Sequence, residues 1–427
     1  MMIICYSLLI RVVDMHFSVP LVELAALLVL GDPILASAQT HQQIDWCENK
    51  DNAVASDVKI NACTVVIQSG RWSGAELAWA YTDRCFAYGD KGDNDRAIAD
   101  CNEAIRLDPK HAMAYNNRCA YYIAKGDNDR AIADCNEAIR LDSKLAVAYN
   151  NRCAYYFAKG DNDRAIADCN EAIRLNPEDA FAYTSRGVAY RAKGDKDRAI
   201  ADYNEAIRID PKRTTAYINR CEYYGDKGDY DRAIADCNEA IGLDPKYAMA
   251  YNNRSNAYKA KGDYDHAIAD AGEAIRLDPK LALAYANRGS AYAHKKDYDH
   301  AIADYDQAIQ IAPTAANFNS RCWVRALAGR DLTRALDDCN ESLRLRPGDG
   351  TTLNSRGLVQ LKIGAFDPAI ADYAAAIATN PKDADSLYGR GMAKLKSGDK
   401  SGGEADIAAA KAIQPDIADV YADYGIT

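Results

Sequence analysis

Lys91-Gly92-Asp93 is the first copy of a tripeptide that returns every 34 residues along the chain. Further copies stand at 125–127, 159–161, 193–195, 227–229 and 261–263. Weaker echoes follow in the same register at Asp297, Asp331, Gly364 and Gly398-Asp399. A fixed period of this length indicates stacked supersecondary units rather than a single globular core. The period therefore predicts an elongated array of repeats.

Each repeat reads as two helices joined by the Lys-Gly-Asp turn. In the repeat containing Tyr115 we predict helix A over about 112–124 and helix B over about 128–141, because the apolar residues have helical spacing. Gly126 can end helix A in the left-handed conformation, and Asp127 can cap helix B. A proline then blocks continuation of helix B in nine repeats: Pro109, Pro177, Pro211, Pro245, Pro279, Pro313, Pro347, Pro381 and Pro415.

This pattern resembles the tetratricopeptide repeat family. The aromatic slot of helix A holds Tyr81, Tyr115, Tyr149, Tyr183, Tyr217, Tyr251 and Tyr285, and the close-contact slot of helix B holds Ala97, Ala131, Ala165, Ala199, Ala233, Ala267, Ala301, Ala335 and Ala369. The resemblance covers ten repeats over 78–417, after a degenerate cap repeat over 39–77 and before a partial capping helix over 418–427. It implies an all-α solenoid of about ten helix-turn-helix repeats in a right-handed superhelix. In the family, the concave face is lined by helix A and takes peptides or helices.

The first 38 residues differ from the rest. They are apolar, their one lysine or arginine is Arg11, and they end in Ala36-Ser37-Ala38. This small-x-small end predicts a signal peptide cleaved near Ala38, with export to the periplasm or beyond. The chain also resembles exported bacterial tetratricopeptide proteins with a Cys-bearing cap, on the strength of Trp46-Cys47, 63–70 and 338–341. A membrane anchor is the alternative, although no uninterrupted apolar stretch reaches about 18 residues. Translation could begin at Met1 or Met15.

Twelve of the thirteen cysteines follow one placement rule. Five repeats carry cysteine in helix A, where the family has glycine, and the same five carry cysteine in helix B, where the family has an aromatic residue. The pairs are Cys85 with Cys101, Cys119 with Cys135, Cys153 with Cys169, Cys221 with Cys237, and Cys322 with Cys339; a sixth pair, Cys47 with Cys63, stands in the cap. The other five repeats show Gly187 with Tyr203, Ser255 with Ala271, Gly289 with Tyr305, Gly357 with Tyr373, and Gly391 with Ile407.

We interpret each pair as a disulfide between helices A and B of one repeat. Bonds between neighbouring repeats would leave Cys221 and Cys237 without partners. In the chain-entropy model each bond of this loop length contributes about 3 kcal/mol, and such bonds fit an oxidising compartment. The alternatives are free cysteines that act as small apolar fillers, or cysteines copied together by duplication. We expect no metal and no cofactor, because Cys-x-x-Cys is absent and the six histidines do not cluster.

A second slot pair is charged in all ten repeats. Helix A carries Arg84, Arg118, Arg152, Arg186, Arg220, Arg254, Arg288, Arg321, Arg356 and Arg390, and helix B carries Asp100, Asp134, Asp168, Asp202, Asp236, Asp270, Asp304, Asp338, Asp372 and Asp406. Each arginine immediately precedes the cysteine or glycine slot of helix A, and each aspartate immediately precedes the partner slot of helix B. If those two slots face each other, the arginine and the aspartate are expected to face each other as well. We favour a structural A–B ion pair, since arginine binds carboxylates through two hydrogen bonds. A basic ladder that grips an anionic polymer is the alternative.

The expected groove is rich in amides. Its candidate partner-binding residues are Asn116, Asn117, Asn150, Asn151, Asn219, Asn252, Asn253, Asn287 and Asn354. Asparagine can donate to and accept from a peptide backbone; simple solvation is the alternative. Near Phe318 the register slips, with one residue missing before Cys322 and one added before Asp331. We expect a bulge in helix A there, which marks either a site or a join between two arrays.

The sequence holds no catalytic signature such as Gly-x-Ser-x-Gly, a phosphate-binding Gly-rich loop or His-Glu-x-x-His. The formal net charge of -10 opposes a general role on nucleic acid or anionic membranes. We therefore expect a non-enzymatic envelope scaffold that binds a protein or peptide along the helix-A face, with no membrane span in the mature chain. The alternatives are a scaffold for envelope polysaccharide or cell-wall machinery that contacts glycan, and an enzyme whose site has no recognised motif.

Overall fold

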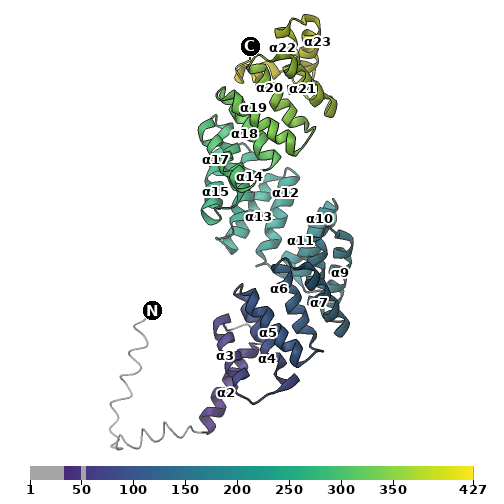
Figure 1. Cartoon of the computed structure of the whole chain (residues 1–427), viewed down its shortest axis with the longest axis vertical. Coiled ribbons are helices and arrows are strands. Elements are labelled where there is room, and N and C mark those ends of the chain that lie inside the picture. Colours follow the sequence, from purple (N-terminus) through teal and green to yellow (C-terminus); the bar gives the residue numbers. More distant parts are fainter. Residues whose placement is uncertain (1–32, 50–53, 427) are drawn as a thin grey trace, which may run out of the picture. The chain divides into compact units, whose positions relative to one another are not determined.

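The computed structural model describes residues 33–49 and 54–426, with side chains from residue 41 onward. Over these ranges every secondary-structure element is a helix, and successive helices pack as pairs (Figure 1). The predicted all-α array of helix pairs is confirmed, while the handedness of the array stays a prediction. The chain divides after Lys193 into two compact halves. The predicted leader, 1–38, lies outside the described residues except for the helical backbone of 33–38.

The N-terminal half holds the cap and three complete repeats. Its helices are α2 (Pro33–Glu48), α3 (Ser56–Gln68), a 3-10 turn (Gly74–Leu77), α4 (Ala78–Asp90), α5 (Asn94–Leu107), α6 (Ala112–Ala124), α7 (Asn128–Leu141), α8 (Ala146–Ala158), α9 (Asn162–Leu175) and α10 (Ala180–Ala192). The even-numbered helices from α4 on are helix A of their repeats. Trp72 of the cap and Trp79 of α4 meet edge to face beside Cys47 and Cys63.

The C-terminal half continues the same alternation of helices A and B. Its helices are α11 (Lys196–Ile209), α12 (Thr214–Asp226), α13 (Tyr230–Leu243), α14 (Ala248–Ala260), α15 (Tyr264–Leu277), α16 (Ala282–His294), α17 (Tyr298–Ile311), α18 (Ala315–Ala328), α19 (Leu332–Leu345), α20 (Gly350–Lys362), α21 (Phe366–Thr379), α22 (Ala384–Ser397), α23 (Lys400–Ile413) and the short α24 (Ile417–Asp423).

The predicted turn chemistry is confirmed in the repeat of α6 and α7. Gly126 has φ of 74°, in the left-handed region that glycine adopts without strain. The N–H of Asp127 returns to the carbonyl of Tyr122 at 2.9 Å, which satisfies an end carbonyl of α6. The Asp127 carboxylate then accepts the N–H of Arg130 and so caps α7. Both helices have the bounds that the sequence predicts.

The expected bulge near Phe318 is wrong. α18 is a continuous helix of 14 residues, and the slip in register is absorbed at its two ends. Thr314 caps it directly after Pro313, and Gly329 and Asp331 take left-handed φ values of 64° and 52°. The extra helical residue therefore shortens the connection before α18 and strains the turn after it, because a left-handed aspartate is unfavourable relative to glycine. No helix within 33–49 and 54–426 is long and apolar enough to cross a membrane.

Candidate functional site

All six predicted cysteine pairs lie at disulfide-bonding distance. In the five repeats the S–S distance is 1.96–2.09 Å and the two Cα atoms are 5.5–5.6 Å apart, while the cap pair has a Cα separation of 4.7 Å. These Cα separations fall within the range that a disulfide spans. The structure pairs Cys47 with Cys63, Cys85 with Cys101, Cys119 with Cys135, Cys153 with Cys169, Cys221 with Cys237, and Cys322 with Cys339. The geometry thus permits every predicted pair, and oxidation in the native compartment stays a prediction.

The cysteine pairs occupy the centre of the contact between helices A and B. Cys101 of α5 is fully buried against Cys85 of α4, in a small cluster that also holds Ala97. Cys169 of α9 is likewise fully buried against Cys153 of α8. All twelve cysteines are buried in this way. The interpretation as free apolar fillers predicts the same burial, so burial does not distinguish it from bonded pairs.

Repeats without cysteine can fill the same space with a large side chain opposite glycine. A Cβ added to Gly357 would meet the Tyr373 ring at 2.9 Å, and one added to Gly391 would meet Cγ1 of Ile407 at 2.7 Å. The Tyr373 side chain is fully buried. Glycine is therefore required where the facing helix supplies such a bulky residue, and a cysteine pair is the second solution to the same A–B contact.

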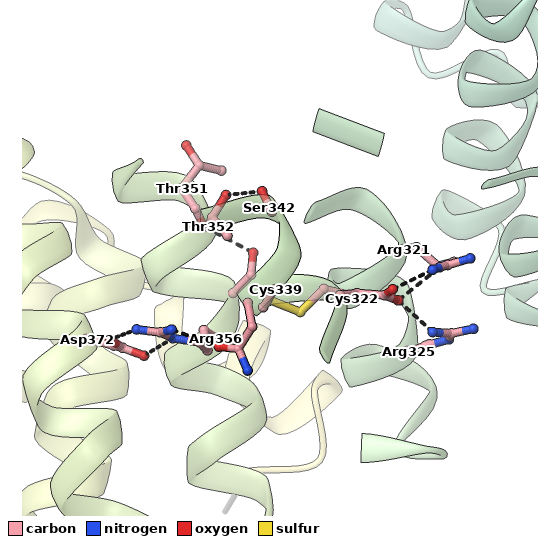
Figure 2. The surroundings of a disulfide bond; sticks show 12 residues. Arg321, Cys322, Arg325, Cys339, Ser342, Thr351, Thr352, Arg356 and Asp372 are labelled. Atoms are coloured by element: carbon pink, nitrogen blue, oxygen red, sulfur yellow. Dashed lines mark hydrogen bonds and ion pairs between the residues drawn. A yellow bond between two sulfur atoms is a disulfide. The ribbon is translucent and has the colours of Figure 1, made fainter. Parts of the chain in front are cut away.

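Figure 2 shows one such contact, the Cys322–Cys339 bond between α18 and α19, with its charged neighbours. Arg321 and Arg325 lie together on one side of the bond, and both donate to the buried carboxylate of Asp338. In the next repeat, Arg356 and Asp372 pair in the same way. The ion pair and the disulfide thus occupy adjacent slots of one helix pair, as the sequence spacing implies.

The arginine–aspartate slots meet in every repeat that lies within one half. In each of these repeats Nε and Nη2 of the arginine donate to the two carboxylate oxygens, for example at 2.7 and 2.6 Å between Arg118 and Asp134. The carboxylates are buried, as Asp134 is with 6% exposure. Hydrogen bonding to Asp168 raises the pKa of Arg152. In the remaining repeat, Arg186 belongs to the N-terminal half and Asp202 to the C-terminal half.

The third nitrogen of the guanidinium reaches the preceding repeat, which the sequence reasoning missed. Nη1 of Arg118 donates to Oδ1 of Asn102 at 2.7 Å, and Nη1 of Arg152 donates to Asn136 at 2.8 Å. The same bond forms from Arg186, Arg220, Arg254 and Arg356 to Asn170, Asn204, Asn238 and Asn340. Since all three guanidinium nitrogens of Arg118 and Arg152 donate inside the protein, the ladder favours a structural role over capture of an anionic polymer.

A further ion-pair ladder connects the turns of successive repeats. In four turns the lysine pairs with an aspartate in the first turn of the preceding helix B: Lys125–Asp95, Lys193–Asp163, Lys261–Asp231 and Lys295–Asp265. The 34-residue recurrence of both residues was the available signal. These groups are exposed to solvent, so each pair contributes little to stability.

The candidate groove asparagines are mostly buried between neighbouring A helices. Asn116, Asn117, Asn150, Asn252 and Asn354 are at most 9% exposed. Their amides bind one another or nearby polar groups: Asn151 donates to Oδ1 of Asn116 at 2.9 Å and Asn287 donates to Oδ1 of Asn252 at 2.9 Å. Simple solvation does not describe these five residues, and each has a polar partner inside the protein, although Oδ1 of Asn150 has none. Their contacts instead tie one helix A to the next, and any role in partner binding stays a prediction.

An apolar stripe lies beside these amides in the N-terminal half. Phe86, Met113, Val147, Phe157 and Phe181 are each 38–42% exposed, although they are large apolar side chains. They occupy the second, ninth or twelfth position of their A helices, and the most buried asparagines occupy the fifth. Positions separated by three, four and three residues share one face of a helix. We call this set the apolar stripe.

In the C-terminal half the same face of helix A borders a cavity of about 710 Å³. Its walls include Asn319 and Trp323 of α18, Thr351 and Asn354 of α20, and Asp385 of α22. Asn319, Asn354 and Trp323 hold the fifth and ninth helix-A positions, and Thr351 and Asp385 hold the second. The irregular segment that the sequence marked thus forms one wall of this cavity.

The C-terminal segment closes another side of the cavity. Trp323 and Tyr424 meet edge to face with ring centroids 5.3 Å apart, and Asp423 pairs with Lys296 at 3.1 Å across 127 residues of sequence. Lys296 has φ of 61°, in a slot that glycine holds in the earlier turns. Tyr421 is buried, and its hydroxyl donates to the Asp385 carbonyl at 2.7 Å. α24 is therefore anchored at Tyr421 and exposed at its end.

Signatures of the tetratricopeptide repeat match residues 87–146, 155–214 and 354–416, with further matches over 222–262, 255–296 and 282–315. The chain belongs to the tetratricopeptide repeat family. Among solved structures, a tetratricopeptide repeat protein from Parabacteroides merdae is 21% identical with a TM-score of 0.44, and covers 55% of this chain and 93% of its own. The Cut9–Hcn1 assembly is 13% identical with a TM-score of 0.49 and coverages of 88% and 87%. PilW, a widely conserved type IV pilus biogenesis factor, is 18% identical with a TM-score of 0.44 and coverages of 48% and 94%. No curated protein matches the chain.

Membership in this family, together with helix pairs that leave one helix face open, supports a protein–protein interaction scaffold. The tetratricopeptide fold is generally a non-enzymatic scaffold. Among the described residues, no three or more His, Cys, Asp or Glu side chains converge in a way that could hold a metal ion.

Proposed function

We propose that this tetratricopeptide protein is an exported, non-enzymatic scaffold that binds an extended peptide or a helix of a partner along the helix-A face. The apolar stripe is the observation that carries the proposal. Five large apolar side chains from α4, α6, α8 and α10 lie on one helix face at roughly 40% exposure. Exposed apolar groups that gather on one face, with polar residues around them, are typical of interaction surfaces.

The chemistry of the stripe suits an apolar partner segment. The neighbouring asparagines already bind one another, so affinity would come from burial of Met113, Val147 and Phe181 rather than from free amides. Burial of apolar surface contributes about 25 cal/mol per Å² before the costs of association are counted. A partner with apolar side chains at repeat spacing would therefore contact several A helices at once.

Envelope location is supported by two features of the chain. Residues 1–38 have the pattern of a cleaved leader, and six cysteine pairs lie at bonding distance. Structural disulfides persist in oxidising compartments and are rare in the cytosol. Fractionation of the native host, with detection of a mature start near Gln39, tests this part of the proposal; full-length protein in the cytosol would contradict it.

Binding is tested by substitution of the stripe. The triple variant Met113→Ser, Val147→Ser and Phe181→Ser should lose the envelope proteins that the intact chain captures by pull-down. The matched control is Leu243→Ser, Ile311→Ser and Leu345→Ser, which removes three apolar side chains of similar exposure from the ends of B helices. Equal capture by both variants would contradict the stripe. Retention on insoluble cell-wall material, with no captured protein, would favour the glycan alternative.

A further inference from the structure

The cavity of the C-terminal half contains two oxygen atoms that lack donors. Oδ1 of Asn319 and Oδ1 of Asp385 are both fully buried, and neither has a hydrogen-bond partner among the described residues. The two residues come from α18 and α22 and line the same cavity. A buried acceptor left without a hydrogen bond destabilises the fold. A ligand that donates hydrogen bonds to both atoms would remove this cost, so the cavity favours a donor.

The charge in the cavity favours a donor that is positive. Asp383, Asp385 and Asp423 line it, and the only lysine or arginine among the lining residues is Lys296, which Asp423 already pairs. His294 also lines it, but burial and, less strongly, the charge of Lys259 lower the pKa of His294, which keeps the ring neutral. The cavity as a whole is therefore negative.

The Asp385 side chain lacks a donor on its buried Oδ1. Burial and, secondarily, the nearby Asp383 raise the pKa of Asp385 above its ordinary range. Asp383 itself has partners, since Asn354 and Ser386 donate to its Oδ2. Asp385 helps to anchor α24 only through its backbone carbonyl, which accepts a hydrogen bond from the Tyr421 hydroxyl. Burial disfavours the charged form of this carboxyl, and a cation beside it would favour that form.

The remaining walls are aromatic. Trp323, Tyr424, Tyr298 and Tyr305 line the cavity, and the rings of Trp323 and Tyr424 meet edge to face. Aromatic faces attract ammonium and guanidinium groups through the negative potential of the ring face. The volume of about 710 Å³ is within the usual range for ligand pockets and exceeds one side chain, so there is room for the flanking backbone.

We propose that this cavity receives the cationic side chain of a lysine or arginine carried by a partner polypeptide, with Asp385 as its counter-ion. The inference rests on the proposed function and adds the chemistry of the partner: a segment with one basic residue among apolar neighbours. Asn319 accepts a second hydrogen bond from the same cation or from the backbone beside it. The aromatic walls enclose the methylene groups.

The test uses a displayed library of random 12-residue peptides selected on the full, oxidised chain. Enriched peptides should share a lysine or arginine at one position. Replacement of that residue by norleucine or citrulline should weaken binding by at least about 30-fold, the loss typical of a buried charge pair. This arm does not depend on the folding of any protein variant. Free L-arginine or cadaverine that binds as tightly as the peptide would contradict a polypeptide ligand.

The protein side is tested with Asp385→Asn against Asp367→Asn. Asp367 is an exposed aspartate in the first turn of α21, so the control makes the same charge change in the same half. Asp385→Asn should weaken the binding of the enriched peptide by at least about 30-fold. Asp367→Asn should change affinity less than about twofold.

The outcomes separate this inference from the proposed function. Peptides that lack a basic residue, or that bind Asp385→Asn as well as the intact chain, overturn the inference. If those peptides are lost in the Met113, Val147 and Phe181 variant, the proposed function stands without it. Enrichment of no peptide at all overturns both.

Discussion

The repeat of α6 and α7 and the repeat of α20 and α21 solve the same A–B contact in two ways. In the first, Cys119 and Cys135 bridge the helices and the buried cluster around them is small. In the second, Gly357 admits the ring of Tyr373, which joins a core that extends through Leu358, Leu387 and Tyr421. Both keep the neighbouring arginine–aspartate pair.

The difference shows what a covalent bond replaces in a thin helical array. A repeat buries little apolar surface by itself and depends on its neighbours. A bulky tyrosine contributes by burial in the folded state, whereas a disulfide contributes mainly by restricting the unfolded chain. The tyrosine needs a glycine on the facing helix, and the disulfide needs an oxidant. Protein made under reducing conditions should therefore be weakened at the cysteine repeats and unchanged at the glycine–tyrosine repeats.

The largest effect is expected from Tyr373→Ala. The ring is fully buried and is wedged between Gly357 and Gly389, where an added Cβ would meet it at 2.3–3.0 Å. Its removal leaves a cavity and should lower the local free energy of unfolding by about 3–5 kcal/mol. Hydrogen exchange of α20 and α21 measures this locally, which suits a long array that does not unfold in one step. Tyr373→Phe keeps the ring and should cost far less; equal losses would contradict the wedge.

Removal of a disulfide should have the next largest effect. Cys119→Ala with Cys135→Ala should lower the local free energy of unfolding by about 3 kcal/mol or less. The same loss should follow reduction of the intact chain, and reductant should not affect the double variant at this repeat. Cys119→Gly with Cys135→Tyr, which transplants the other solution, should recover part of the loss. Hydrogen exchange of α6 and α7 with and without reductant provides the readout.

A methyl group at the glycine slot should cost less again. Gly357→Ala forces the Tyr373 ring to move, and overpacking of this kind costs about 1–3 kcal/mol. Gly242→Ala is the matched control, because Gly242 is in α13 and has no neighbour within 4 Å of an added Cβ. The control should be stabilised by up to about 1 kcal/mol through helix propensity. If both variants are stabilised, the steric account of the slot is wrong.

The smallest effect is expected from loss of the hydrogen bond that the arginine makes to the preceding repeat. Arg118 in a cysteine repeat and Arg288 in a glycine–tyrosine repeat both bind an aspartate. The slot next to Nη1 holds Asn102 for Arg118, which accepts a hydrogen bond, and Gly272 for Arg288, which has no side chain to accept one. Arg118→Lys should therefore cost about 0.5–1.5 kcal/mol more than Arg288→Lys, the value of one hydrogen bond. Equal losses in denaturant unfolding would show that the inter-repeat bond contributes nothing.

The periodic features of this protein could be predicted from the sequence because each is decided inside one repeat. The bounds of α6 and α7 follow from Gly126 and Asp127, and the facing of Arg118 and Asp134 follows from matched slots. Contacts between repeats were harder to predict from the sequence. The burial of Asn116 depends on how closely two A helices approach, and residue polarity at that slot does not reveal it.

The cavity could not be predicted for a related reason. It depends on the contact of Asp423 with Lys296 across 127 residues, and on an α18 that is one residue longer than the A helices α16 and α20 and has no bulge. The slip near Phe318 was a usable signal that this segment differs, but not of what it faces. Features that need several repeats to converge are set by accumulated geometry rather than by any one slot.

The central claim is that the cysteine repeats are held by disulfides in the compartment where the protein acts. Intact mass of protein trapped in the native host with acid, then alkylated in denaturant without reductant, tests it most directly. Denaturant is needed because all twelve cysteines are buried and would resist alkylation in the folded chain whatever their oxidation state. The account predicts a mature start near Gln39 and no alkylated thiol until reductant is added. Twelve alkylated thiols without reductant would contradict it.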